Sequence, residues 1–233
     1  MKKLSIIIPV LNEETTLVEV LKRVYQAPSL DFQKEIIVVD DGSTDRSSVI
    51  LENLKDKYQL IILKHQRNLG KGEAIQTGLA AATGEAIIIQ DADLEYWPED
   101  WPKLLRELES CQLDLGAIYG SRNLKPKKKG YFHYVLGVWF LTLINNLLFK
   151  AKLTDVYTCY KLFPADLIKS IPLESDGFEI EAEITAKILK KGYQIKEVGI
   201  NYEPRKFQEG KKIRLKDGLK GLWTMFKWRF KKN

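Results

Sequence analysis

The amino-acid sequence predicts an α/β protein with a doubly wound, mostly parallel sheet flanked by helices. In the first half of the 233-residue chain, short apolar runs rich in Ile and Val alternate with segments of helical periodicity. The runs show no alternation of polar and apolar residues, which is typical of strands buried on both faces of a parallel sheet. Each strand–helix–strand connection is expected to be right-handed.

The predicted elements follow one another through the first 90 residues. The strands cover residues 4–8, 35–39, 60–63 and 85–89, and the helices lie near 13–26, 45–57 and 70–82. In sheets of this kind ligands bind beyond the carboxyl ends of the strands, so the segments after the strands are the first candidates for a site. These segments are acidic or contain glycine, and none is apolar.

The second half of the chain contains an uncharged segment, residues 130–149, in which 14 side chains are apolar. A membrane-spanning helix needs about 20 predominantly apolar residues, so this segment is borderline. Because His133, Asn145 and Asn146 would be costly in hydrocarbon, we expect a buried or membrane-lying helix pair instead of a span.

Residues 215–233 predict a basic amphipathic helix at the end of the sequence. Its apolar residues recur at steps of three or four: Leu215, Leu219, Leu222, Trp223, Phe226 and Phe230. Lys216, Lys220, Lys227 and Arg229 lie among them. Two interpretations stay open: the apolar stripe packs on the core, or the helix lies on an anionic membrane surface with its tryptophans at headgroup depth.

Composition and charge exclude several classes of protein. The chain is long enough for one domain with a sizeable core. Two cysteines are too few for a disulfide framework or a zinc site, so a reducing cytoplasm is expected. The N-terminal apolar run has no small-residue cleavage site and indicates a strand, not a signal peptide.

The net charge of +6 combines two unlike halves. Residues 1–120 hold 13 basic and 20 acidic side chains, and residues 121–233 hold 24 and 11. Residues 205–233, with 11 basic and 2 acidic side chains, have the charge that binding to nucleic acid requires. They contain no nucleic-acid-binding motif, and the acidic loops would repel such a ligand, so no nucleic-acid partner is expected.

Two carboxylates follow the fourth predicted strand. Asp91 and Asp93 are one residue apart, so they project to the same side of an extended backbone and can hold a hard divalent cation, and with it a diphosphate. Glu95 either adds a third ligand or faces water. The alternative for all three is a solvated acidic turn.

Two further loops contain residues suited to a ligand or to a turn. Asp40 and Asp41 are placed to contact a ribose or base edge, while Ser43 or Thr44 is suited to capping the next helix. A plain strand-to-helix turn uses the same residue types. The segment RNLGKGEA, residues 67–74, matches neither the phosphate loop nor the dinucleotide fingerprint. It indicates a nearby anion, a tight backbone approach or a glycine-assisted helix start.

Taken in order, these motifs resemble those of family 2 inverting glycosyltransferases, and most closely the dolichol-phosphate (polyprenyl-phosphate) mannosyltransferases. The segments GSRN, TDVYTCYKLF, GFEIEAEITAKILKKGY and EPRKFQEGKKI continue the resemblance, which covers residues 4 to about 215. It implies a GT-A fold, a GDP- or UDP-hexose donor, and Mg²⁺ or Mn²⁺. We therefore expect one domain over 1–233, with a nucleotide-sugar-binding half (1–120), an acceptor-side half (121–214) and the terminal helix.

The resemblance also implies roles for individual residues. Base and ribose contacts fall on Pro9, Leu11, Glu13 and Asp40. Asp91 and Asp93 become metal ligands that bridge the donor diphosphate, with Asp93 also in a catalytic role, and Glu95 stands where the family often has Gln. Arg122 becomes the catalytic arginine aimed at the acceptor phosphate, and Arg205 and Lys211 close over the donor diphosphate. Relatives often carry a second arginine soon after GSR, and here Lys127, Lys128, Lys129 or His133 takes that place.

The acceptor decides whether a general base is needed. A lipid phosphate is already an anionic nucleophile, whereas a sugar hydroxyl must lose its proton to a carboxylate. The candidates for that base are Asp176, Glu179, Glu181 and Glu183. Because Glu179 and Glu183 share a helix face, a solvated face is expected for most of these carboxylates.

Residues 154–163 alternate in polarity and predict a strand that borders the site. Asp155 and Lys161 either serve the acceptor or form a local salt bridge. Cys159 is expected to be a small core residue.

The expected function is transfer of a hexosyl group, mannose or glucose, from a nucleotide sugar to a polyprenyl phosphate. The alternative is a family 2 transferase that acts on a sugar hydroxyl in cell-wall or surface polysaccharide synthesis. We expect peripheral attachment to the cytoplasmic face of a membrane, through the amphipathic segments or through a separate anchoring subunit.

Overall fold

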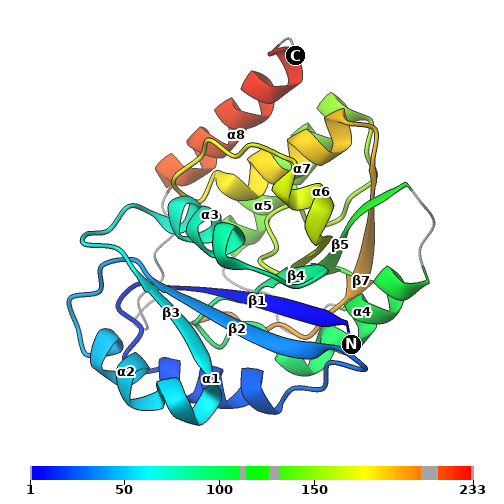
Figure 1. The fold of residues 1–233 in the computed structure, drawn as a ribbon. Helices are drawn as coiled ribbons and strands as arrows, with labels where there is room; N and C mark the ends of the chain where they lie inside the picture. Colours follow the sequence, from blue (N-terminus) through cyan, green and yellow to red (C-terminus); the bar gives the residue numbers. More distant parts are fainter. Residues whose placement is uncertain (1, 111–113, 126–131, 206–214, 232–233) are drawn as a thin grey trace.

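A single seven-stranded sheet organises the computed structural model, which describes residues 2–110, 114–125, 132–205 and 215–231 (Figure 1). The strands are β1 (Lys3–Val10), β2 (Gln33–Asp40), β3 (Leu60–Lys64), β4 (Ala86–Ile89), β5 (Leu115–Ser121), β6 (Lys161–Pro164) and β7 (Gln194–Gly199). They lie in the order β3-β2-β1-β4-β6-β5-β7. All pairings are parallel except those of β6, which runs antiparallel to both β4 and β5. The predicted mostly parallel sheet is therefore confirmed.

The first four strands occur where the apolar runs predict them. Ile7 at the centre of β1 pairs with Ile37 of β2 and with Ile89 of β4, and all three side chains are buried. Burial on both faces explains the unbroken apolar runs, because neither side of the sheet centre meets water.

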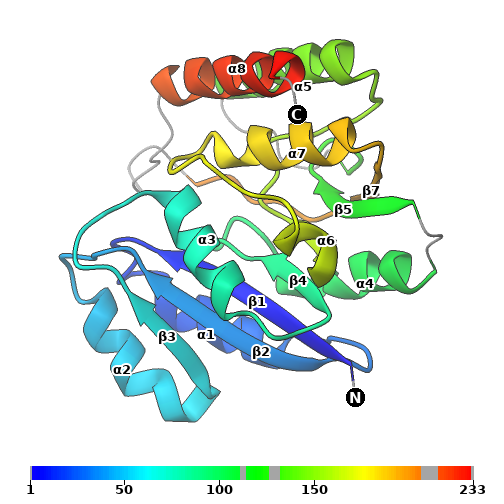
Figure 2. The same ribbon diagram turned by 45° about the horizontal axis from the view of Figure 1, so that its top comes forward.

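Helices cover both faces of the sheet. They are α1 (Leu17–Gln26), α2 (Ser47–Tyr58), α3 (Lys71–Ala81), α4 (Trp101–Glu109), α5 (Phe132–Phe149), α6 (Ala165–Lys169), α7 (Ile180–Lys190) and α8 (Leu215–Phe230), with a short 3-10 turn η1 (Pro98–Asp100). In Figure 1, α1 and α2 lie on the opposite side of the sheet from α3. Figure 2 shows α7 between the sheet and the pair α5 and α8, which contact each other.

Two predictions for the second half are wrong. The uncharged segment forms the single helix α5, not a helix pair, and Asn146 secures the chain after it by hydrogen bonds to both backbone polar groups of Leu153. The expected strand over 154–163 is a strand only from Lys161 onward. Before it the chain is a loop, whose Thr154 and Asp155 N–H groups donate to the Glu197 carboxylate and not to a neighbouring strand.

The solvated face expected around GFEIEAEI is also wrong. Glu179, Glu181 and Glu183 are all buried, because α7 is enclosed between the sheet and the α5–α8 pair (Figure 2). Glu183 pairs with Lys187 and accepts hydrogen bonds from the N–H groups of Glu174 and Ser175.

Within the described part of the chain, no helix combines the length and the apolar character needed to cross a membrane.

Candidate functional site

The carboxyl ends of the parallel strands meet at one edge of the sheet, as the topology predicts. The segments after β1, β2, β4 and β5 carry the predicted site residues there. Pro9 and Leu11 at the end of β1 are partly exposed, and Pro9 pairs in register with Val39 of β2. The edge is completed by the start of β6 and by the chain that follows β7.

Arg205 contacts three residues of the predicted site, Glu13 and Asp93 of the donor set and the expected metal ligand Glu95. Its guanidinium pairs with Glu13 through both terminal nitrogens, and its Nε donates to the Asp93 carbonyl at 2.9 Å. Its backbone N–H donates to Glu95 Oε1 at 2.8 Å. Burial alone would lower the pKa of Arg205, but the Glu13 hydrogen bond and the charges of Asp93, Glu13 and Glu95 raise it. The guanidinium therefore stays charged at the centre of an acidic cluster.

The carboxylates at this edge crowd one another. Burial, followed by the negative charges of Asp91 and Glu95, raises the pKa of Asp93 to about 8. A divalent cation between Asp91 and Asp93 would relieve this repulsion, and two carboxylates with substrate phosphates and water are a usual ligand set for Mg²⁺. The two aspartates therefore fit the cation by their chemistry.

Glu95 is less available as a metal ligand. Its carboxylate accepts hydrogen bonds from Tyr202 Oη at 2.9 Å and from the Arg205 N–H. Among the residues that the structure describes, no three or more His, Cys, Asp and Glu side chains group in a way that could hold a metal ion. The third-ligand role of Glu95 stays a prediction.

The carboxylates of Asp40 and Asp41 both accept hydrogen bonds from other residues of the protein. Asp40 accepts from the Ser43 N–H at 2.9 Å and from the Ser48 hydroxyl. Asp41 accepts from the N–H groups of Leu69 and Gly70, each at 2.8 Å. The turn interpretation accounts for the contacts of Asp40, whereas Asp41 joins this turn to the segment before α3. Contact of Asp40 with a donor stays a prediction.

The expected helix cap at Ser43 or Thr44 is wrong. The helix α2 begins later, at Ser47, and the Asp45 carboxylate accepts the Ser47 N–H at 2.9 Å. The Ser43 hydroxyl instead accepts the N–H of Asn12, which ties the loop after β2 to the loop after β1.

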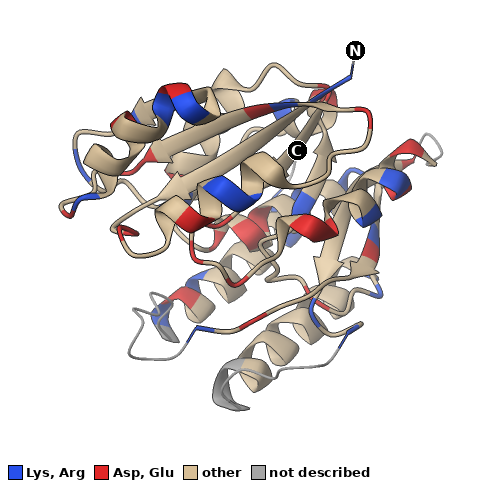
Figure 3. Cartoon of the chain, turned by 90° about the horizontal axis from the view of Figure 1, so that it is seen from below, with Lys and Arg blue, Asp and Glu red and all other residues tan. Residues whose placement is uncertain are grey.

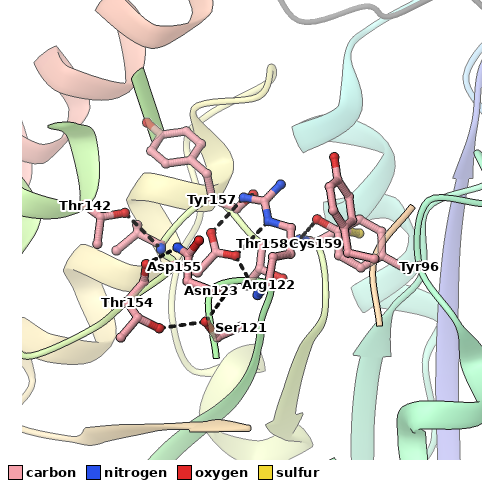
Figure 4. Close-up of polar contacts among 12 residues, drawn as sticks. Tyr96, Ser121, Arg122, Asn123, Thr142, Thr154, Asp155, Tyr157, Thr158 and Cys159 are labelled. Carbon is pink, nitrogen blue, oxygen red and sulfur yellow. Dashed lines mark hydrogen bonds and ion pairs between the residues drawn. The ribbon is translucent and has the colours of Figure 1, made fainter. Parts of the chain in front are cut away.

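Arg122, the predicted acceptor-phosphate ligand, is held by Asp155 (Figure 4). Nε and Nη2 of Arg122 each donate to a different Asp155 oxygen at 2.7 Å, and Nη2 also donates to the Tyr157 carbonyl at 3.1 Å. Burial disfavours the charged guanidinium, but the Asp155 carboxylate raises the pKa of Arg122 well above its ordinary value. Three of the five guanidinium N–H donors are thus used by the chain, and the Nη1 group is the part not committed to Asp155 or Tyr157.

Lys71 has a role at this edge that its sequence does not signal. Its ammonium lies 2.9 Å from Asp91 Oδ1 and 3.1 Å from Glu181 Oε1. The expected tight backbone approach is confirmed, because the Gly72 N–H donates to the Asp176 carbonyl at 2.7 Å and Lys71 meets the chain's own carboxylates. Lys161 pairs with the other oxygen of Glu181, which confirms the local salt bridge among its two expected roles. Cys159 is buried beside them, as expected of a core residue.

Some predicted residues lie outside the described parts of the chain. These are Lys127, Lys128, Lys129 and Lys211, and the side chain of His133.

Residues 5–171 match the model of a protein family described as glycosyl transferase family 2. The chain therefore belongs to glycosyl transferase family 2, as the order of its motifs predicts.

Three relatives extend the comparison. The dodecaprenyl-phosphate galacturonate synthase of Rhizobium johnstonii is 34% identical over 73% of this chain and 50% of its own length. The undecaprenyl-phosphate 4-deoxy-4-formamido-L-arabinose transferase of Proteus mirabilis is 40% identical over 46% of this chain and 34% of its own length. An uncharacterized protein of Methanocaldococcus jannaschii is 31% identical over 84% of this chain and 86% of its own length. The chain thus spans half or less of the two relatives whose activity is named.

Solved structures of glucosyl-3-phosphoglycerate synthase from Mycobacterium tuberculosis share the fold. A complex with Mn²⁺, UDP and phosphoglyceric acid superposes with a TM-score of 0.76 at 19% identity, covering 100% of this chain and 80% of that one. A complex with Mn²⁺ and UDP-glucose gives a TM-score of 0.73 at 20% identity, covering 98% and 79%. The predicted GT-A-like fold is confirmed.

Proposed function

We propose that the chain transfers a hexosyl group, mannose or glucose, from GDP- or UDP-hexose to a polyprenyl phosphate, with inversion at the anomeric carbon. The observation that carries the proposal is the contact of Arg205 with Glu13, Asp93 and Glu95, because it joins the segment after β7 to those after β1 and β4 at the sheet edge. Relatives named for dodecaprenyl and undecaprenyl phosphate support the acceptor class.

The donor half of the site would bind the nucleotide through Pro9, Leu11, Glu13 and Asp40. Arg205, joined by Lys211, would exchange its contact with Glu13 for the donor diphosphate. A guanidinium that is already desolvated loses little hydration on meeting a phosphate, and its planar fork matches the phosphate oxygens.

Asp91 and Asp93 would hold Mg²⁺ or Mn²⁺, with Glu95 as a further ligand. A divalent cation supplies charge neutralisation for the departing nucleoside diphosphate. The complexes of the structural relative with Mn²⁺ and UDP or UDP-glucose support this cofactor. The chain's own contribution is to keep the two carboxylates close together and partly shielded from water, where electrostatic stabilisation is strongest.

A phosphate acceptor suits the acceptor side better than a hydroxyl does. Glu181 and Glu183 are committed to buried ion pairs with Lys161 and Lys187, which weakens them as bases for a hydroxyl. The Nη1 group of Arg122, with Lys129, would orient the acceptor phosphate. Such a nucleophile carries its charge already, so no residue has to remove a proton.

The helices α5 and α8 provide the surface that would reach a lipid. On α5 the side chain of Trp139 is 58% exposed, and on α8 those of Trp223 and Phe230 are 71% and 70% exposed. The sequence of α5 holds no charged residue, in agreement with the absence of red and blue on this helix in Figure 3. In the sequence of α8, lysines lie between the aromatic residues. Apolar and aromatic groups with a basic rim suit an anionic bilayer interface.

The exposure pattern of α8 supports one of its two interpretations. Thr224, Met225 and Trp228 of α8 are buried, and Leu222 is half-buried. Leu219, Trp223 and Phe230 of the predicted stripe are exposed, which supports the membrane-surface interpretation over packing on the core. We propose that this stripe attaches the protein peripherally to the cytoplasmic face of a membrane, with or without an anchoring subunit.

The test supplies the full chain with Mn²⁺, with GDP- or UDP-hexose, and with either polyprenyl phosphate in anionic vesicles or soluble glycans. Hexosyl transfer to the lipid phosphate, lost in Asp91→Asn and in excess chelator, is the expected result. Transfer only to glycans would favour the hydroxyl-acceptor alternative, and transfer unchanged by chelator would contradict the metal role.

A further inference from the structure

Four side chains of alternating charge run from the site into the interior, in the order Asp91, Lys71, Glu181, Lys161. The buried end is closed by further contacts of Lys161, whose ammonium donates to the Thr158 carbonyl and lies 4.8 Å from the centre of the Tyr119 ring. The Lys161 side chain is 0% exposed, whereas that of Asp91 is 21% exposed. Asp91 is thus the member of the series that faces the site.

Backbone contacts fix the position from which Lys71 enters this series. Gly70 has a φ of +107° and donates its N–H to Asp41 Oδ2 at 2.8 Å, while the Gly72 N–H donates to the Asp176 carbonyl at 2.7 Å. A Cβ at position 70 would lie 2.3 Å from that same carbonyl oxygen. The start of α3 is therefore in direct backbone contact with the segment that precedes α7.

The two oxygens of Asp91 have conflicting uses. Both lie within 3.1 Å of the Lys71 ammonium, and the proposed divalent cation needs at least one of them. An ammonium and a divalent cation at one carboxylate repel each other strongly in a partly buried site. Glu181 Oε1, 3.1 Å from the Lys71 ammonium, offers it a second anionic partner. Lys71 can therefore remain buried and paired when the cation occupies Asp91.

We propose that Lys71 is a resident counter-cation that competes with the divalent cation for Asp91, and that Glu181 is the positioning residue that retains Lys71 when the divalent cation binds. The inference rests on the proposed role of Asp91 as a ligand of that cation. It adds that the Lys71–Glu181 pair sets the affinity of the site for the cation.

The test measures Mn²⁺ binding to the full chain without nucleotide, by the relaxation of water protons. Lys71→Met removes the competing charge and is expected to bind Mn²⁺ about tenfold tighter or more. Glu181→Gln leaves Lys71 with Asp91 as its anionic partner and is expected to bind Mn²⁺ several-fold more weakly. Lys71→Arg keeps the positive charge, so its affinity for Mn²⁺ should be close to that of the wild type and below that of Lys71→Met.

The matched control is Lys187→Met, which removes another buried lysine–glutamate pair, that of Lys187 and Glu183 on α7. Its Mn²⁺ affinity should equal that of the wild type. Loss of the fold can only weaken binding, so tighter binding by Lys71→Met cannot come from misfolding. If Lys71→Met lacks a cooperative thermal transition, Glu181→Gln decides, and an unchanged affinity there overturns the proposal.

Asp91→Asn separates the failure of this inference from the failure of the proposed site. Wild-type Mn²⁺ affinity in Asp91→Asn would overturn both, because the cation would then bind elsewhere. If Asp91→Asn loses Mn²⁺ affinity but Lys71→Met binds Mn²⁺ no more tightly than the wild type, the proposed site stands. The competition between Lys71 and the cation would then be overturned.

Discussion

The guanidinium of Arg205 meets the carboxylate of Glu13 in a two-point contact between residues 192 positions apart in the chain. The pair joins the segment after β7 to the segment after β1, across the entrance to the acidic cluster. Both side chains are nearly buried, at 12% and 9% exposed. In the proposed function, both residues belong to the site of the nucleoside diphosphate.

Arg205→Ala is expected to weaken binding of UDP or GDP in the presence of Mn²⁺ by tenfold to a hundredfold. Hydrogen bonds to charged groups contribute about 1.5–3 kcal/mol, which corresponds to that range. Isothermal titration calorimetry measures the effect. Arg23→Ala is the matched control, because Arg23 forms a similar two-point pair with Glu99 away from the site. Equal nucleotide affinity in the two variants would contradict the donor-site role of Arg205.

Asp155→Ala is expected to reduce the free energy of unfolding by about 3–5 kcal/mol, because it leaves the Arg122 guanidinium buried without its partner. Urea denaturation measures this loss. Glu19→Gln, which breaks the exposed Lys22–Glu19 pair, should change stability by less than about 1 kcal/mol. A loss in Asp155→Ala no larger than in this control would show that the pair is not structural.

Acidification is expected to weaken the attachment of α8. Hydrogen bonds from Lys227 and Lys231 lower the pKa of Glu174 from 4.5 to about 2. A depressed carboxylate pKa stabilises the folded state above pH 4.5, and that stabilisation is lost as the pH falls toward 2. The difference in thermal midpoint between the wild type and Glu174→Gln should therefore shrink over this window. It should also shrink in high salt, since these side chains are exposed. A difference that stays constant down to pH 2 would contradict the assignment.

Trp223→Ser and Trp139→Ser are each expected to weaken binding to anionic vesicles by about tenfold or more. Burying a large aromatic side chain in an apolar environment contributes about 2 kcal/mol, and each variant loses that contribution. Vesicle co-sedimentation measures the affinity. Trp97→Ser removes a partly exposed tryptophan that lies beside Arg23, away from α5 and α8, and should bind as the wild type does. Vesicle binding that survives truncation near Arg214 would show that α8 is not the attachment.

The sequence predicts the N-terminal half of the fold, where the hydrophobic pattern of each segment matches its burial in the folded protein. The first four strands are buried on both faces, so an unbroken apolar run is a sufficient signal for each of them. The meeting of Glu13 and Asp93 at one edge also follows from the order of the predicted strands, because parallel strands bring their carboxyl ends together. The place of Arg205 beside them was implied only by the resemblance to the family.

Features that depend on contacts between distant segments were not predictable in the same way. The residues next to Glu181 in sequence do not indicate that its helix is enclosed on two sides. The pattern of glutamates therefore predicted a solvated face, although three of them are buried. The pairing of Lys71 with Asp91 and Glu181 depends on how α3 and α7 meet. The alternation in residues 154–160 comes from side chains of a loop that is held by Glu197, and it mimics the pattern of a strand.

The glycines on either side of Lys71 restrict which substitutions this segment can accept during evolution. A side chain at position 70 would strike the backbone of Asp176, and one at position 72 would strike the backbone of Ser175. Variation in this tripeptide is therefore confined to its middle residue. A single-codon replacement of Lys71 can alter the charge at the edge of the sheet while the surrounding turn is inherited unchanged.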